Sequence, residues 1–272
     1  MIELPKMWEG KRAHGLMRNL REWIDPALNM RVPLKPMDRG PWLDRDHGDV
    51  MLPKDGRRPK QLVIFLHGVN GRGKAWRWMA DIWRSYLPDA AFVFPDGIER
   101  SGAMPGMFQW WELRSLDSRD VRSGVRRAAP RFLRFLDQVQ DVLQIAPEAT
   151  ILGGFSQGAM LALHVGERNK PAFAGILAFG GMAANLPRHR GKVRSAPPIF
   201  LYHGTHDRIV PFSTHERTGS RLSELGFDVA RWAAEGVDHT IDAEGAERAG
   251  QWMRQWLRDP ASANTREMTR VA

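Results

Sequence analysis

A serine flanked by two glycines is the residue whose surroundings point most directly to chemistry. Ser156 lies in Gly154-Phe155-Ser156-Gln157-Gly158, which fits the pattern G-x-S-x-G. In that pattern the serine occupies a strained corner between a strand and a helix, and its hydroxyl points outward as a nucleophile. The glycines are small because the neighbouring backbones pass too closely for a Cβ atom. The chain is apolar before Ser156 and rich in helix formers after it, as such a corner requires.

A serine hydroxyl becomes a good nucleophile only when a base removes its proton. Histidine is the usual base, and a carboxylate fixes its tautomer and stabilises the imidazolium. With this kind of corner the chain order is serine, acid, histidine, which leaves His239 as the candidate base. Asp207 follows a late strand and is preferred as the acid over Asp228, which begins a strand, and Asp238, the direct neighbour of the histidine. The alternatives are a surface histidine and a turn-forming aspartate.

Attack on an acyl carbon creates a negative oxygen, which needs N–H donors that are already in place. One donor is expected from the amide of Gln157, directly after the nucleophile and at the start of a helix. The second is expected from the loop after His67, and we predict the amide of Val69, with Gly68 as its neighbour. Both donors are backbone groups, so the residue types there carry little information. A plain turn at the end of a strand is the alternative for this loop.

Strands and helices alternate around these residues. Strand patterns cover residues 49–53, 61–66, 91–94, 150–155, 173–179, 199–202 and 229–232; helical patterns cover 76–87, 121–143, 157–169, a segment from 213, and 243–257. The turn at Lys54-Asp55-Gly56 predicts that the first two strands form a hairpin. Ser213 to Glu216 fits a capping box and predicts a helix start. Pro130 is expected to kink its helix or to restart it.

This alternation favours a mostly parallel sheet covered by helices on both faces. Ligands bind such sheets beyond the carboxyl ends of the strands. His67, Ser156, Asp207 and His239 all fall in turns or loops at that edge. We therefore expect these four side chains to converge, although they lie far apart along the chain.

The long loop from Ile98 to Leu113 is rich in methionine and aromatic residues. Met107, Phe108, Trp110 and Trp111 lack helical spacing, so they are candidates to line a groove for an acyl chain, together with Met104. The other interpretation places them in the hydrophobic core. The sequence favours neither.

Composition limits the remaining possibilities. The chain has no cysteine, which excludes disulfides and cysteine-ligated zinc. Its net charge of +9 comes from scattered basic residues without interleaved aromatics, so we expect no nucleic-acid partner. No apolar run approaches a membrane span, and no secretory signal is recognisable, so a cytoplasmic location is expected. We predict an irregular segment packed on the main domain over residues 1–48, with a flap over the site as the less favoured alternative. A catalytic domain is predicted over 49–258 and a polar tail over 259–272.

Several of these motifs together resemble the phospholipase/carboxylesterase family of α/β hydrolases, which includes acyl-protein thioesterases and bacterial carboxylesterases. The motifs are Leu66-His67-Gly68, the corner around Ser156, the run from His203 to Pro211, and His239. The loop from Phe94 to Leu113 also resembles bacterial members, and the whole resemblance covers roughly residues 50–257. Asn70-Gly71 stands where the family commonly has G-D, and Trp110-Trp111-Glu112 stands where it usually has W-F-D.

The resemblance implies an α/β-hydrolase fold and a serine hydrolase that cleaves carboxylic esters through an acyl-enzyme. Ser156 matches the nucleophile, Asp207 the acid and His239 the base, and no metal or organic cofactor is needed. The expected partner is a small-molecule acyl ester. An acyl-thioesterase, a polyester depolymerase or a peptidase would use the same three residues, and a non-catalytic lipid- or partner-binding descendant is less favoured. Acyl chain length, leaving group and oligomeric state are not readable from the sequence.

Overall fold

The structure, a computed structural model, describes residues 48–258. The predicted N-terminal segment, except for Gly48, and the predicted polar tail lie outside the described residues. Among the described helices, none is long and apolar enough to cross a membrane.

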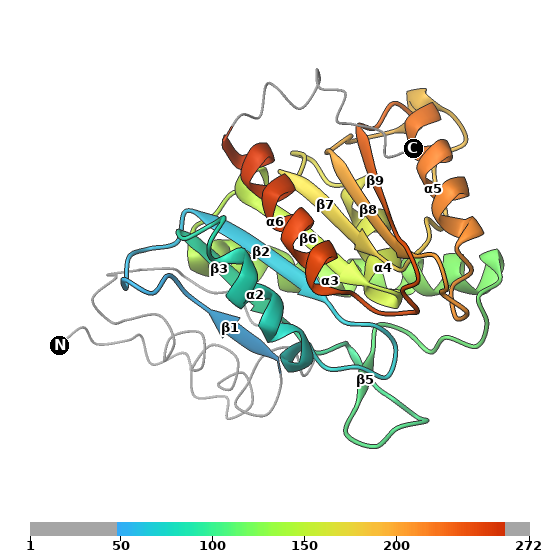
Figure 1. Cartoon of the computed structure of the whole chain (residues 1–272), viewed down its shortest axis with the longest axis horizontal. Coiled ribbons are helices and arrows are strands. Elements are labelled where there is room, and N and C mark those ends of the chain that lie inside the picture. Colours follow the sequence, from blue (N-terminus) through green and yellow to red (C-terminus); the bar gives the residue numbers. More distant parts are fainter. Residues whose placement is uncertain (1–47, 259–272) are drawn as a thin grey trace.

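A seven-stranded sheet forms the centre of the described chain (Figure 1). Its strands are β1 (Asp49–Met51), β2 (Gln61–Leu66), β3 (Ala90–Phe94), β6 (Thr150–Phe155), β7 (Gly175–Phe179), β8 (Ile199–Gly204) and β9 (Val229–Ala234). They lie in the order β1-β3-β2-β6-β7-β8-β9. Only β1 runs antiparallel to its neighbour, and all other pairs are parallel. The strand that leads to Ser156 is therefore central, with three strands on each side.

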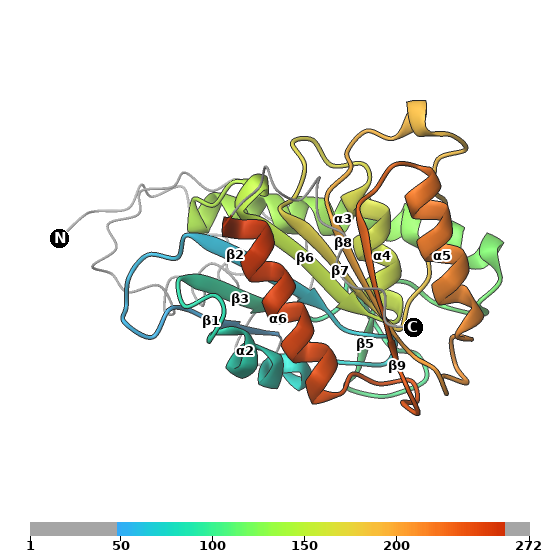
Figure 2. The same ribbon diagram turned by 45° about the horizontal axis from the view of Figure 1, so that its top comes forward.

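Helices cover both faces of this sheet (Figure 2). They are α2 (Arg77–Trp83), α3 (Ser118–Leu143), α4 (Gln157–Gly166), α5 (Ser213–Glu224) and α6 (Ala243–Arg258), and a short 3-10 helix, Gly73–Trp76, precedes α2. Buried residues of α2 and α6 pack on one face, and those of α3, α4 and α5 pack on the other. The predicted mostly parallel sheet between two helical layers is confirmed.

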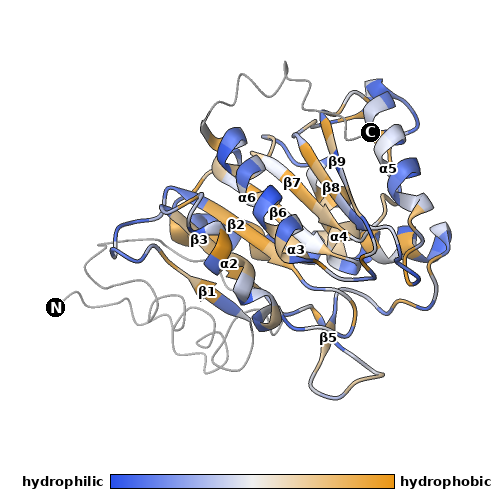
Figure 3. Cartoon of the chain, in the orientation of Figure 1, coloured by the Kyte–Doolittle hydropathy of each residue, from blue (hydrophilic) through white to orange (hydrophobic). Residues whose placement is uncertain are grey.

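Burial on both faces explains why the central strands are apolar throughout. In β2, Val63 and Phe65 face the layer of α2 and α6, while Leu62, Ile64 and Leu66 face the layer of α3 and α4. Successive side chains of a strand point to opposite faces, so both sets must be apolar. Figure 3 shows the central strands as largely hydrophobic, whereas helices such as α5 and α6 carry hydrophilic stretches.

The predicted hairpin between the first two strands is wrong. β1 pairs with β3, with Asp49 opposite Phe94, and β2 lies between β3 and β6. The turn at Lys54-Asp55-Gly56 does form, since the amide of Gly56 donates to the carbonyl of Pro53. However, β2 is apolar on both faces and takes an interior place in the sheet, where its two edges already pair with parallel strands. The short β1 is left to close the edge of the sheet at β3.

The structure also corrects the predicted capping box at Ser213 and decides between the two alternatives for Pro130. The helix α5 does begin at Ser213, but Phe212 is the N-cap residue and no side chain caps it. The chain already turns before Ser213, because the amide of Thr214 donates to the carbonyl of Pro211. The capping-box interpretation is therefore wrong. Pro130 lies inside a continuous α3, so the helix does not restart there.

Candidate active site

Ser156 lies at the corner between β6 and α4 in a strained conformation. Its φ is 53° and its ψ is −115°, a region that residues other than glycine rarely adopt. Such strain costs on the order of 1–3 kcal/mol and persists only where the surrounding structure imposes it. Here the Ser156 amide donates to the carbonyl of Phe179 at 2.8 Å, and its carbonyl accepts from the amide of Met160. The corner is thus fixed to both β7 and α4.

The two glycines beside the corner are required by close backbone contacts. A Cβ atom on Gly154 would lie 2.4 Å from the carbonyl carbon of Gly158. A Cβ atom on Gly158 would lie 2.2 Å from the carbonyl oxygen of Leu66. The start of α4 is therefore pressed against the ends of β6 and β2, which is the steric reason expected from the sequence.

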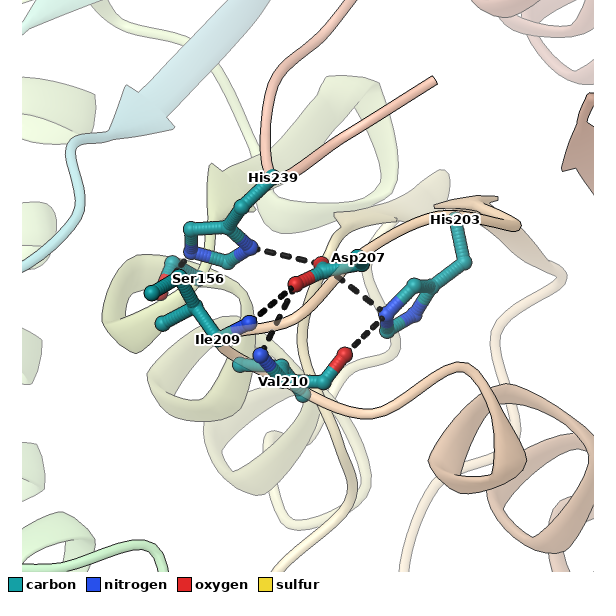
Figure 4. A network of polar contacts seen from close by, with 6 residues as sticks. All are labelled: Ser156, His203, Asp207, Ile209, Val210 and His239. Carbon is teal, nitrogen blue, oxygen red and sulfur yellow. Dashed lines mark hydrogen bonds and ion pairs between the residues drawn. The ribbon is translucent and has the colours of Figure 1, made fainter. Parts of the chain in front are cut away.

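The structure brings Ser156, His239 and Asp207 together at the carboxyl edge of the sheet (Figure 4). His239 Nε2 lies 3.0 Å from the Ser156 hydroxyl, and His239 Nδ1 lies 2.6 Å from Oδ2 of Asp207. Because Nδ1 faces a carboxylate, it carries the hydrogen of the neutral ring. Nε2 is then free to accept the serine proton.

The Asp207 carboxylate is buried and held by several donors. Its Oδ1 accepts hydrogen bonds from the amides of Ile209 and Val210, each at 2.9 Å. Its Oδ2 binds His239 and also lies 3.2 Å from Nε2 of His203. Sequence reasoning did not select His203. The available signal was its place on the strand that leads to Asp207, four residues before the acid.

The imidazole of His239 is positioned by packing as well as by hydrogen bonds. Its ring centroid lies 4.6 Å from that of Phe155, which in turn packs on Trp76 at 4.9 Å. The His239 side chain is 16% exposed. Phe155 also lies against the ends of two strands, since a Cβ atom on Gly68 or Gly180 would come within about 3.2 Å of its ring. An aromatic residue next to the serine therefore orients the histidine.

The loop after β2 lies directly against the serine corner. A Cβ atom on Gly68 would be 3.3 Å from Cβ of Ser156. Gln157 is the first residue of α4, so its amide has no partner within the helix and lies at the positive end of the helix dipole. This placement suits the amides of Val69 and Gln157 as donors to an oxyanion, and that role stays a prediction.

His67 is not part of the relay but fixes the loop beside it. Its Nε2 accepts from the amide of Gly97 at 2.8 Å, so the hydrogen is on Nδ1, which lies 2.6 Å from the carbonyl of Gly68. Complete burial lowers the pKa of His67 to about 4, so the ring is neutral at physiological pH. A trans peptide directs its C=O and N–H to opposite sides. The contact with the Gly68 carbonyl therefore also sets the direction of the Val69 N–H.

The side chain of Gln157 fixes a second loop. Its Oε1 accepts from the amide of Trp110 at 2.9 Å, and its Nε2 donates to the carbonyl of Trp111 at 2.8 Å. The indole of Trp110 donates to the carbonyl of His67. The loop of residues 98–113 is thereby attached to the base of the site, and its ends pair as the short strands β4 (Glu99–Arg100) and β5 (Phe108–Gln109).

The structure corrects the interpretation of three residues in this loop as groove residues. Trp110 and Trp111 have no exposed surface, and Phe108 is 1% exposed. The indole of Trp111 fills the space left by Gly124 of α3, where a Cβ atom would lie 2.1 Å from its Nε1. These aromatic residues pack in the core beneath the site. Met107 is partly exposed, and its contact with substrate stays a prediction.

No cluster of histidine and carboxylate side chains within residues 48–258 is arranged to hold a metal ion. What the arrangement offers is a nucleophile, a base and an acid in line, next to a helix start and a loop with backbone donors. Such a set can carry out acyl transfer at a carbonyl carbon.

Comparison with known proteins gives a consistent result. The sequence profile described as Phospholipase/Carboxylesterase matches residues 48–257. Acyl-protein thioesterase 1 of Candida albicans is 26% identical over 72% of this chain and 91% of its own length. Esterase YpfH of Escherichia coli is 27% identical over 78% of this chain and 89% of its own length. The crystal structure of esterase PE8 superposes with a TM-score of 0.73 and 31% identity, covering 78% of this chain and 99% of that one.

Proposed function

The chain belongs to the phospholipase/carboxylesterase family, and on that premise we propose that it cleaves carboxylic esters through an acyl-enzyme on Ser156. The predicted family, the α/β-hydrolase fold and the serine-hydrolase class are confirmed by the family match and the likeness to esterase PE8. The residue roles and the substrate are our proposal. The observation that supports it most strongly is the unbroken line of hydrogen bonds from Asp207 through His239 to Ser156.

Acylation begins when His239 Nε2 takes the proton of Ser156 as its oxygen attacks the acyl carbon. The C=O electron pair moves to the carbonyl oxygen, and the amides of Gln157 and Val69 hold the resulting oxyanion. Asp207 stabilises the imidazolium that has formed. When the oxyanion collapses, the bond to the leaving oxygen breaks, and His239 gives its proton to the departing alcohol.

Deacylation repeats these steps with water as the nucleophile. His239 deprotonates the water as it attacks the acyl-enzyme, and the same two amides hold the second oxyanion. Collapse releases the carboxylic acid, and the proton returns from His239 to Ser156. The cycle consumes one water and restores the enzyme, so it needs no other reactant.

The surface beside the relay suits an ester with an apolar part. Ile209, two residues after Asp207, is 61% exposed although it is aliphatic. Phe155 packs on His239 and Trp76 packs on Phe155, and both aromatic side chains are half-buried. We propose that a small-molecule acyl ester contacts these side chains. The predicted cytoplasmic location is kept as part of this proposal.

An acyl-thioesterase is the second candidate, because relatives such as that of Candida albicans carry that name. The same residues would act, with a thiol as the leaving group. Comparing kcat/KM on p-nitrophenyl esters with kcat/KM on acyl-thioesters of equal chain length decides between the two candidates.

Replacement of the nucleophile tests the proposal directly. Ser156→Ala should lose kcat on the order of a millionfold, by analogy with another serine hydrolase. The same variant should not react with a fluorophosphonate probe, and its thermal unfolding should match that of the wild type. Ser220→Ala, at an exposed position on α5, is the matched control and should keep full activity. Hydrolysis that survives in Ser156→Ala would refute the proposal.

A further inference from the structure

A second histidine contacts the acid of the proposed relay. Figure 4 shows Asp207 between the rings of His239 and His203. His203 Nε2 lies 3.2 Å from Oδ2 of Asp207 and 2.8 Å from the carbonyl oxygen of Val210. Both neighbours are hydrogen-bond acceptors, so Nε2 must carry a hydrogen. The geometry alone therefore fixes the tautomer of a neutral His203 ring.

Four donors converge on this one carboxylate. The amides of Ile209 and Val210 bind Oδ1, and the rings of His239 and His203 approach Oδ2. An ionised carboxylate has about four lone-pair sites, so all of them have a partner. Donors to the ionised form stabilise it. The carboxylate cannot rotate without losing several of these contacts at once.

The surroundings of His203 keep it a neutral donor. Its side chain is 1% exposed, and its ring packs on those of Phe212 and His215 at 6.0 and 5.8 Å. Burial lowers the pKa of His203. Burial, and to a smaller extent unfavourable electrostatic interactions with His203 and Arg231, lowers the pKa of His215 to about 4. The titratable groups near His203 are thus Asp207, His239 and His215. A neutral ring can bind the carboxylate without adding a second positive charge to the site.

We propose that His203 is a positioning residue: its Nε2–H fixes Oδ2 of Asp207 toward His239 and limits how strongly that oxygen binds the His239 ring. The proposal rests on the proposed function, in which Asp207 and His239 are acid and base. His203 touches neither the substrate nor Ser156. It acts through the carboxylate alone.

Loss of this donor has two expected consequences. Without it Oδ2 is less firmly oriented, so the alignment of His239 with Ser156 loosens and kcat falls, while substrate binding is unchanged. A carboxylate with one donor fewer also interacts more strongly with the imidazolium, which favours the protonated form of the base. The acid limb of the rate profile should therefore move to higher pH.

Two variants separate the donor from the bulk of the ring. His203→Leu removes the donor at similar size, whereas His203→Gln places an amide nitrogen near the position of Nε2. With the full chain and a p-nitrophenyl ester, we expect kcat about tenfold lower in His203→Leu, by analogy with a lost bond to a charged group. KM should stay within about twofold, and the acid limb should move up by about half a pH unit. His203→Gln should restore most of kcat, and the acid limb of its pH–rate profile should lie at the wild-type pH.

His215→Leu is the matched control, because this buried histidine packs on His203 but has no bond to Asp207. It should leave the acid limb in place. Equal losses in His203→Leu and His203→Gln, or a wild-type pH profile in His203→Leu, would overturn the proposal.

A measurement on the unmodified protein does not depend on whether a variant folds or on ester hydrolysis. The ¹⁵N chemical shifts of His203 at neutral pH should show a protonated Nε2 and a bare Nδ1. A bare Nε2 would refute the assignment. If instead this tautomer is found but Ser156→Ala remains active, the proposed function fails while the contact between His203 and Asp207 stands.

Discussion

The two sides of Ser156 are built on different principles. On the acid–base side, in the turns after β8 and β9, polar side chains bind one another, as His239 and His203 bind Asp207. On the oxyanion side, in the loops after β2 and β3, the side chains that support the proposed amide donors bind backbone. His67 contacts the carbonyl of Gly68, and Gln157 binds the loop of residues 98–113.

This difference separates the reacting groups from their supports. On the acid–base side the side chains themselves are the proposed reacting groups, so substitutions there should reduce kcat at nearly constant stability. On the oxyanion side the proposed reacting groups are amides, which substitution does not remove. Changes to the supporting side chains should therefore reduce stability first and kcat less.

The largest effect in this comparison is expected for Asp207→Asn. The amide keeps an oxygen for the backbone donors but favours the wrong tautomer of His239, so kcat should fall on the order of ten-thousandfold. The melting temperature should change little. Asp238→Asn is the matched control, because this exposed neighbour of His239 was one of the two less favoured candidate acids. Steady-state kinetics on a p-nitrophenyl ester measure both variants, and a larger loss in Asp238→Asn would reverse the assignment.

A stability effect is expected next, for Gln157→Ala. The change removes the hydrogen bonds between the Gln157 side chain and the buried amide of Trp110 and the buried carbonyl of Trp111, and each lost bond costs roughly 1–3 kcal/mol. The helix amide at position 157 remains, so kcat should fall by no more than about tenfold. Urea unfolding and kinetics on the same samples measure the two effects. Ser220→Ala, at an exposed site on α5, should change neither the stability nor kcat. If Gln157→Ala instead lost much of its kcat at wild-type stability, the two sides of Ser156 would not differ in the way proposed.

The same contrast explains what the sequence reveals. Ser156, Asp207 and His239 could be selected because chemistry restricts the residue types and the fold class restricts their order. The structure brings these three within hydrogen-bonding distance. His203 was missed because a histidine that supports a carboxylate looks like any other buried histidine in sequence. Its role depends on a contact that only the folded turn creates.

The errors came from features that local sequence does not determine. The turn at Lys54-Asp55-Gly56 is a genuine local signal, but the partner of β1 depends on which strand edges remain free in the complete sheet. Trp110 and Trp111 are buried because Gln157 holds their backbone and Gly124 leaves room for an indole. Neither of these two residues lies in the loop itself.

A pH-dependent effect on the oxyanion side is expected from His67. Its pKa is about 4 in the folded protein, below the ordinary value of 6.5. Well above pH 6.5 the ring is neutral in both the folded and the unfolded state and adds no pH dependence. As the pH falls toward 4, the His67 ring is protonated mainly in the unfolded chain. The free energy of unfolding therefore falls by roughly 3 kcal/mol.

His67→Gln removes this titratable ring. The free energy of unfolding of the variant should therefore fall less steeply between pH 6.5 and pH 4 than that of the wild type. Urea unfolding at pH 7.5 and pH 4.5 measures the difference between the variant and the wild type. His189→Gln, at an exposed site, is the control and should follow the wild-type curve. An unchanged slope in His67→Gln would show that other groups govern acid unfolding, among them His215, whose pKa is also lowered to about 4.

The smallest effect is expected at Asn70, which follows the proposed donor Val69. Its φ is 55°, and its side-chain oxygen accepts from the hydroxyl of Ser101 at 2.6 Å. Asn70→Gly loses this bond but keeps the backbone conformation without strain. Asn70→Ala loses the bond and also strains the backbone. Asn70→Ala should be about 1 kcal/mol less stable than Asn70→Gly, because alanine rarely adopts a positive φ.

Kinetics on the two Asn70 variants sharpen the comparison between the sides. If the backbone conformation matters only as a support, kcat should stay within about threefold of the wild type in both, because the Val69 amide is kept in place by His67 through Gly68. If kcat instead falls by much more in Asn70→Ala than in Asn70→Gly, the direction of the Val69 N–H depends on the residue that follows it. The oxyanion side would then be as sensitive as the acid–base side, but through its backbone conformation instead of its side chains.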